Sequence, residues 1–153
     1  MKELCIFGSS NDSFLSSMDF GHMFDRVMFM DYPSVDSMQE FKKENCDLLV
    51  ILGLPEHSER VMSMMMNFNV NAAVSVSPDF NPELKYRLSR IESPLMIVNG
   101  SDDEERFLKS GRMYHDYIEN STLKVLKKCG HFPYRDRKES FFLTLKRFLE
   151  DAL

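Results

Sequence analysis

The stretch from Asp47 to Met65 reads DLLVILGLPEHSERVMSMM, and it is the first place in the sequence where chemistry is expected. An apolar run ends at Gly53 and is followed by a segment with helical spacing, which predicts a strand, a sharp turn and a helix. In many enzymes with this layout a nucleophile lies at the turn, two residues after the glycine. Here that position is Pro55, which carries no nucleophilic group. The sequence therefore predicts a turn of the kind that presents a nucleophile, with a proline at the nucleophile position.

Alternating strand-like and helix-like segments surround this turn. Most of the apolar runs are continuous, which is typical of parallel strands buried on both faces. The pattern predicts an α/β fold over residues 1–153, a single domain in which a mostly parallel six-stranded sheet is the middle layer of a three-layer sandwich. The strand-like runs are 3–8, 26–32, 47–53, 72–78, 94–100 and, nearer the sheet edge, 123–130; the helical stretches are 37–45, 58–68, 104–118 and 137–153.

The residues that directly follow the predicted strands are the first candidates for a site. Parallel α/β sheets bind their ligands beyond the carboxyl ends of the strands. The segments at these positions are rich in Ser, Asp and His, which points to a polar site at this edge of the sheet. They are 8–12, 31–34, 53–58, 77–80, 99–103 and 129–133.

The charge and the cysteine pattern argue against several functions. The 153 residues carry a formal net charge of −5 and no basic stripe, so we expect neither a nucleic-acid nor an anionic-membrane partner. No apolar run has the length of a transmembrane helix, and the first residues show no secretory signal pattern. Three cysteines without paired motifs predict reduced thiols in a cytoplasmic protein, and we expect no metal site and no cofactor.

Two C-terminal stretches resemble the α/β-hydrolase superfamily. SPLMIVNGSDD, residues 93–103, looks like the family's penultimate strand and the loop that carries its catalytic acid. LKVLKKCGHFPYRDRKESF, residues 123–141, looks like the last strand, the Gly-His pair of the catalytic histidine and the helix after it. The GSDD and CGHF pieces are especially similar to small, capless serine hydrolases of the retinoblastoma-binding-protein-9 type. Upstream, LCIFGSSND, RVMFMDYPS and LLVILGLPEHS match the oxyanion loop, the Asp-x-Pro-Gly strand and the Gly-x-Ser-x-Gly motif by position.

The resemblance implies a minimal, lidless version of the family fold. Lys2 already opens the strand that corresponds to the family's third, so the first two family strands have no counterpart. Only residues 79–90 occupy the place where many members insert a lid.

The resemblance also implies a catalytic histidine and acid. His131 fits the general base, and Asp103 fits the acid that orients it, with Asp102 as a rival one position earlier. The structural alternatives stay open at this point. The histidine could hold the turn at 130–133 by hydrogen bonds, and either acid could cap the helix that starts near Glu104.

In the same alignment the nucleophile motif is degenerate. The serine of such an elbow has a positive φ, whereas proline locks φ at about −65°, so Pro55 removes both the hydroxyl and the backbone geometry. Glu56 stands where an N–H would complete the oxyanion hole, and its carboxylate would oppose a developing negative charge. The structural alternative places Pro55 in the first turn of a helix. Substitute nucleophiles would be Ser58, Ser9 or Ser10, and the candidate binding residues are Gly8, Ser9, Glu56 and His57.

These patterns favour an α/β-hydrolase-like protein that is non-catalytic and binds a small molecule or a protein partner. The alternative is an active carboxylesterase or thioesterase in which His131 and Asp103 act with an unconventional nucleophile or an activated water. A third hypothesis is a flavodoxin-type fold, although FGSSND has a single glycine and no convincing phosphate loop. An exposed sheet edge would also allow a homodimer.

Overall fold

A six-stranded parallel β-sheet is the centre of the computed structural model of this chain. The structure describes residues 1–9, 12, 15, 18–31, 34, 36, 38–39 and 47–153. The strand order is β2-β1-β3-β4-β5-β6, and every neighbouring pair is parallel. The strands are β1 (Lys2–Phe7), β2 (Arg26–Met30), β3 (Leu48–Gly53), β4 (Ala72–Val76), β5 (Leu95–Gly100) and β6 (Ser121–Leu126).

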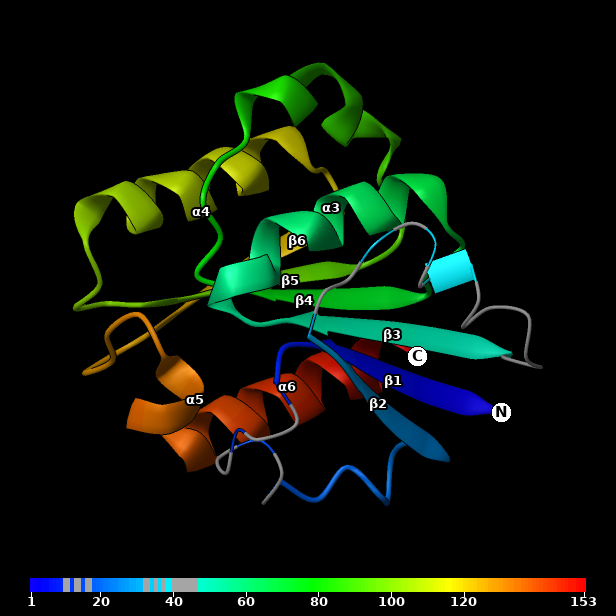
Figure 1. Cartoon of the computed structure of the whole chain (residues 1–153). Helices are drawn as coiled ribbons and strands as arrows, with labels where there is room; N and C mark the ends of the chain where they lie inside the picture. Colours follow the sequence, from blue (N-terminus) through cyan, green and yellow to red (C-terminus); the bar gives the residue numbers. More distant parts are fainter. Residues whose placement is uncertain are drawn as a thin grey trace.

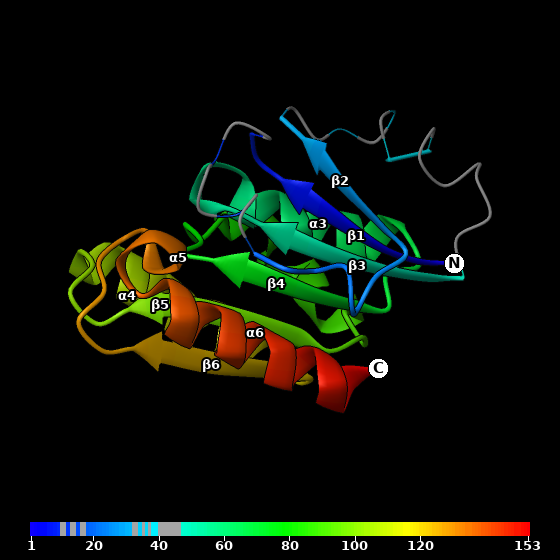
Figure 2. The ribbon, with the colours of Figure 1, turned by 90° about the horizontal axis from the view of Figure 1, so that it is seen from below.

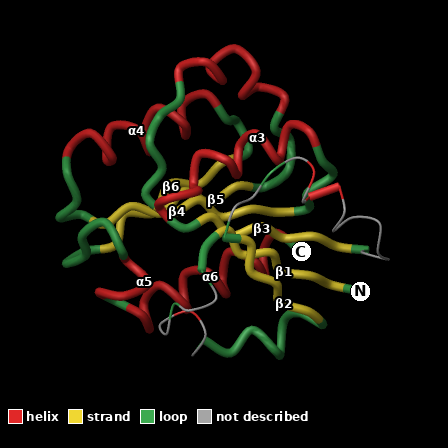
Figure 3. Tube along the Cα trace, in the orientation of Figure 1, coloured by secondary structure: helices red, strands yellow, loops and turns green. Residues whose placement is uncertain are grey.

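Helices cover both faces of this sheet. In Figures 1 and 3, α3 and α4 lie on one face together with the 3₁₀ segment η2, and α5 and α6 lie on the other. Figure 2 shows α6 running across the opposite face of the twisted sheet. The predicted three-layer sandwich is therefore confirmed. The helical elements are η1 (Pro55–His57), α3 (Ser58–Asn67), η2 (Pro82–Arg90), α4 (Glu105–Tyr117), α5 (Pro133–Asp136) and α6 (Lys138–Ala152).

The continuous apolar runs of the sequence follow from burial on both faces. Alternate residues of a strand point to opposite faces. In β1, Leu4 and Ile6 join the core under α6, whereas Cys5 and Phe7 join the core under α3. All four side chains are fully buried, so no polar residue interrupts the run.

Strand β6 behaves as the predicted edge strand. It pairs only with β5 among the described residues, and exposed residues such as Thr122 and Lys124 alternate with half-buried ones at its start. Strand β2 forms the other edge of the described sheet. A homodimer through either edge stays a prediction.

The predicted helices differ from the structure mainly at their ends. The C-terminal helix buries Phe141, Leu145 and Leu149 at four-residue spacing, as expected for an amphipathic helix, but the short helix α5 precedes it. The sequence patterns did not predict η2, whose first turn is capped by the Asn81 side chain accepting a hydrogen bond from Glu83 N–H at 3.0 Å. The predicted helix over 37–45 lies largely outside the described residues. None of the described helices has the length and apolar character needed to cross a membrane.

Candidate functional site

His131 and Asp103 form a hydrogen-bonded pair beyond the carboxyl ends of two neighbouring strands. Asp103 follows β5 and His131 follows β6. The imidazole Nδ1 lies 2.8 Å from Asp103 Oδ2. The Asp103 side chain is 3% exposed and that of His131 is 28% exposed. A carboxylate at Nδ1 fixes the orientation of the ring and leaves Nε2 as the nitrogen for proton transfer or ligand binding.

Close backbone packing brings these two loops together. A Cβ atom on Gly100 would lie only 2.1 Å from the carbonyl oxygen of Gly130, so this approach requires glycine. The Asp102 N–H donates a hydrogen bond to the Cys129 carbonyl at 2.7 Å, and the Lys128 N–H donates one to Ser101 Oγ at 3.1 Å. Gly100 and the hydrogen bonds between the two loops therefore place Asp103 beside His131.

The structure distinguishes between the two candidate acids. Asp103 accepts a hydrogen bond from the Glu104 N–H through Oδ1 at 2.8 Å while its other oxygen contacts His131. Its carboxylate thus orients the histidine and also binds a backbone N–H at the start of α4. Asp102 is exposed, and the only hydrogen bond of its side chain among the described residues is a long one, at 3.4 Å, from the Ser101 hydroxyl.

The side chain of Ser77 forms a hydrogen bond with the main chain of His131. It is fully buried directly after β4, and its hydroxyl donates a hydrogen bond to the His131 carbonyl oxygen at 2.9 Å. Its φ is +49°, in the left-handed region where a serine is strained. The sequence places Ser77 after a strand, but no motif indicated this contact.

The turn after β3 contains a 3₁₀ segment, η1, instead of a nucleophile elbow. Pro55 is the first residue of η1, where its missing N–H costs no hydrogen bond, as in the structural alternative for this residue. Among described residues other than glycine, positive φ occurs only at Ser77 and Lys128. A Cβ on Gly53 would lie 2.3 Å from Val61 Cγ2, so this glycine allows α3 to pack tightly on β3. The turn therefore packs tightly through Gly53, and none of its described residues has a positive φ.

Ser58 is placed by the fold for a structural role. It is 1% exposed at the start of α3, and its hydroxyl donates to the Pro55 carbonyl oxygen at 3.0 Å. Its own carbonyl oxygen accepts a hydrogen bond from Ser75 Oγ at 2.8 Å. The Ser58 hydroxyl is therefore committed to the turn itself.

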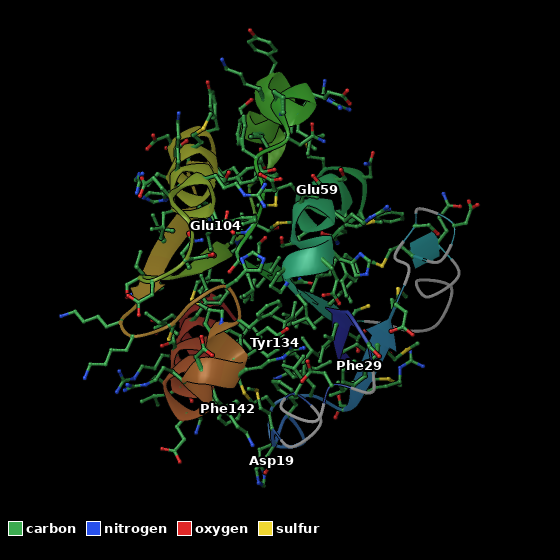
Figure 4. All side chains as sticks on the ribbon, turned by 60° about the vertical axis from the view of Figure 1, so that its left-hand side comes forward. Asp19, Phe29, Glu59, Glu104, Tyr134 and Phe142 are labelled. Atoms are coloured by element: carbon green, nitrogen blue, oxygen red, sulfur yellow. The ribbon has the colours of Figure 1, made fainter. Side chains whose placement is uncertain are left out.

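A cleft of about 330 Å³ opens in front of the His131 ring. The ring centroids of Phe107 and Phe132 lie 4.2 and 5.0 Å from that of His131, so two phenyl rings flank the imidazole. Figure 4 shows Glu59 at the start of α3 and Glu104 near the start of α4, with Tyr134 on α5. The cleft is lined by Pro55, Glu56, Ser58, Glu59, Asp79, Phe107, His131 and Phe132.

One of the four predicted binding residues lines this cleft. Among the described residues that line the cleft, Glu56 is present but Gly8, Ser9 and His57 are not. The Gly8 N–H donates to the Met30 carbonyl, and the Ser9 carbonyl accepts from the Asp12 N–H, so both residues stabilise loops at the ends of β1 and β2. Ser10 lies outside the described residues.

Two groups that shape this cleft were missed by sequence reasoning, whereas Asp79 lies in the predicted candidate segment 77–80. Glu59 lies one residue beyond the candidate segment 53–58, so its closeness to a strand end was a usable signal. Phe107 lies in the first turn of α4 and carried no such signal. A larger groove of about 480 Å³, lined in part by Pro94, Thr122 and Arg147, lies between α6 and the amino-terminal parts of β5 and β6, away from His131.

Tyr134 is the other unusual group at this end of the sheet. Its hydroxyl is buried and has no hydrogen-bond partner among the described residues. Burial raises the pKa of Tyr134 to about 12, with Arg135, Asp12 and Glu56 as its charged neighbours. Arg135 itself donates to Asp12 Oδ2 at 3.0 Å, and this bond raises the pKa of the guanidinium group.

Among the described residues that line the cleft, one imidazole is oriented and the one serine hydroxyl is hydrogen-bonded. His131 keeps Nε2 available, whereas the hydroxyl of Ser58, the serine that lines the cleft, is occupied. The described residues also contain no group of three or more His, Cys, Asp or Glu placed to hold a metal ion. The arrangement can bind a ligand beside an oriented imidazole, or polarise a water molecule there.

We compared this chain with protein families and with solved structures, and the structural likeness shows its fold. No family model matches the chain. A predicted CIB-like hydrolase of Thermoplasma acidophilum is similar in structure, with a TM-score of 0.83 at 18% identity over 98% of this chain and 86% of that one. MGS-MChE2, an alpha/beta hydrolase enzyme from the metagenome of lagoon sediments of Mar Chica, Morocco, gives a TM-score of 0.79 at 13% identity over 98% and 91%. At such identities the likeness shows the fold alone.

Several curated relatives are similar in sequence over part of their length. One of them is the pimeloyl-[acyl-carrier protein] methyl ester esterase of Neisseria meningitidis, 26% identical over 68 residues. The matched region is 44% of this chain and 27% of the esterase, so the similarity spans about a quarter of that relative.

Proposed function

We propose that this chain, which has the α/β-hydrolase fold, binds a small molecule in the cleft beside His131 and forms no covalent acyl intermediate. The observation that carries the proposal is Pro55 at the start of η1, in the place of the nucleophile. A serine hydrolase needs a hydroxyl presented to the histidine by a strained turn. Proline excludes that backbone state, and the nearby Ser58 hydroxyl is bonded to the Pro55 carbonyl.

With Pro55 at the turn after β3, the rest of the cleft is suited to binding. The phenyl rings of Phe107 and Phe132 supply apolar contact area, and His131 supplies one oriented polar group. A concave site with apolar walls and a few placed polar groups is the usual form of a small-molecule site. Its volume is at the small end of the range for such sites, which favours a small ligand.

The direct test is covalent labelling. The purified chain is incubated with a fluorophosphonate probe and with short-chain p-nitrophenyl esters, and its intact mass is measured. We expect no adduct and no burst of p-nitrophenol. An adduct on any serine, absent in Ser58→Ala or in His131→Ala, would overturn the proposal.

A second candidate function is hydrolysis by an activated water. It is favoured by the 2.8 Å contact between His131 and Asp103, because a histidine oriented by a carboxylate can remove a proton from water. The similarity to a methyl ester esterase makes an ester the first bond to test. This route predicts steady turnover without an adduct and its loss in His131→Ala. Turnover that persists in His131→Ala would exclude it.

A further inference from the structure

Three carboxylates line the cleft, and among the described residues none of them forms an ion pair. Glu56, Glu59 and Asp79 all have exposed side chains at its rim. Within the described residues, none of these side chains forms an ion pair or a hydrogen bond. Glu56 contributes to the field that raises the pKa of Arg135, but the hydrogen bond to Asp12 is the main cause of that shift.

The two arginines next to the cleft are already paired with acids outside it. Arg106 stacks on the Phe107 ring at 4.3 Å and contacts Glu104 at 3.2 Å. The other, Arg135, stacks on the Phe132 ring at 4.6 Å and contacts Asp12 at 3.0 Å. Each arginine therefore has a carboxylate of its own, and the cleft keeps the negative charge of its three lining acids.

The cleft combines this charge with apolar walls. Phe107, Phe132 and Pro55 provide hydrocarbon surface on either side of the imidazole. A ligand that fits needs an apolar body of limited size and a group that tolerates three nearby carboxylates. A carboxylate or phosphate on the ligand would meet like charges, and like charges at short range disfavour binding.

We propose that the cleft takes a small organic cation, an ammonium group carried on an apolar body, and discriminates against organic anions of the same shape. This inference rests on the proposed function, because it specifies the ligand class of the same cleft. It also separates this chain from the esterase to which it is partly similar, whose name describes an ester carried on an acyl carrier protein. The three carboxylates are exposed, so the preference should weaken as salt screens them.

Three probes with a common benzyl-type ring test the proposal. They are benzyltrimethylammonium, benzyl alcohol and benzoate, titrated into the full chain while the His131 ring resonances are followed by NMR. We expect the cation to bind at least tenfold more tightly than benzoate and more tightly than benzyl alcohol, with the advantage shrinking between 20 and 500 mM salt. Benzoate binding as tightly as the cation, or no response to the cation at 20 mM, would overturn the proposal.

Matched charge variants separate the cleft from the overall charge of the chain. The double variant Glu59→Gln/Asp79→Asn removes two carboxylates from the cleft. The control Glu92→Gln/Glu119→Gln removes two exposed carboxylates that line a separate depression. We expect the first variant to lose at least fivefold in affinity for the cation and the control to stay within twofold. Equal losses in both variants would show a general charge effect and contradict the cleft assignment.

The outcomes also distinguish this inference from the proposed function. If the fluorophosphonate labels a serine but the cation still binds preferentially, only the non-covalent function fails. If no labelling occurs and the cation shows no preference, only the ligand class fails.

Discussion

The hydroxyl of Ser77 donates a hydrogen bond to the carbonyl oxygen of His131, 54 positions away in the sequence. Ser77 makes this bond from a left-handed backbone conformation, with φ at +49°. A strained, buried residue that holds the main chain of the site histidine is typical of a constraint set by the surrounding structure.

Substitution of Ser77 should separate strain from hydrogen bonding. Ser77→Ala keeps the strained φ and leaves the His131 carbonyl without its donor, so we expect a loss of about 1–2 kcal/mol in the free energy of unfolding. Ser77→Gly loses the same bond but adopts positive φ without strain, so it should be more stable than Ser77→Ala. Urea denaturation measures both. A glycine variant less stable than the alanine variant would show that φ at this position carries no strain.

The two neighbouring acids should differ sharply in their contribution to stability. Asp103→Ala removes a nearly buried carboxylate that binds both the His131 ring and the Glu104 N–H, and we expect a cost of about 2–3 kcal/mol. Asp102→Ala alters an exposed side chain and should stay within about 0.5 kcal/mol. Urea denaturation tests the difference, and NMR of the His131 ring should change only in the Asp103 variant. Similar costs for both would contradict the assignment of Asp103 as the partner of His131.

Restoring a serine at the turn should not restore a hydrolase. Pro55→Ser supplies the hydroxyl. Position 55 nevertheless remains the first residue of the 3₁₀ segment η1 and lacks the positive φ of an elbow. We expect no fluorophosphonate adduct and a loss of about 0.4–1 kcal/mol, because the unfolded chain gains freedom when proline is removed. Intact-mass analysis is the measurement. Labelling of the serine variant, absent in Pro55→Ala, would mean that the backbone can adopt the elbow.

Removing the buried hydroxyl of Tyr134 should not destabilise the protein. The hydroxyl has no hydrogen-bond partner in the part of the chain that the structure describes, so Tyr134→Phe removes a desolvated polar group and keeps the ring packing against Phe141. We expect a stability between unchanged and about 1 kcal/mol higher. Tyr114→Phe is the control, because its hydroxyl donates to Asp79 O and accepts from Asn81 N–H. That variant should lose about 1–3 kcal/mol, and a comparable loss in Tyr134→Phe would reveal a partner for its hydroxyl in solution.

Alkaline pH should destabilise the fold through its buried acids. Burial raises the pKa of Cys5 from 9.0 to about 12, and that of Tyr114 from 10.0 to about 12. The unfolded chain therefore releases these protons at a lower pH than the folded chain does. The contribution of these groups to the free energy of unfolding is fully present below about pH 9 and is lost as the pH rises through about 12. Urea unfolding at pH 8, 9.5 and 10.5 should show the decline. In Cys5→Ala the slope between pH 9 and 10 should be smaller, whatever its absolute stability, and an unchanged slope would contradict the assignment to Cys5.

The sequence by itself determined the architecture and placed a proline at the turn after β3. Continuous apolar runs such as 48–53 and 95–100 are local features of the sequence. They predict strands that are buried on both faces of a parallel sheet, as the structure shows. The geometry at Pro55 is equally local, because the pyrrolidine ring restricts φ wherever the residue lies. Among the described residues, the element ends and the short elements α5 and η2 departed from the prediction, since capping and short helical segments depend on neighbouring loops.

The tertiary structure decided which residues meet at the site. His131 and Asp103 are 28 positions apart, and the choice of Asp103 over Asp102 follows from the close approach of the backbones at Gly100 and Gly130. The hydrogen bond of the Ser58 hydroxyl to the turn and the gathering of three carboxylates along the cleft also became visible only in three dimensions. Contacts of this kind depend on the conformations of several loops that are far apart in the sequence. Sequence periodicity indicates only on which face of one element a residue lies.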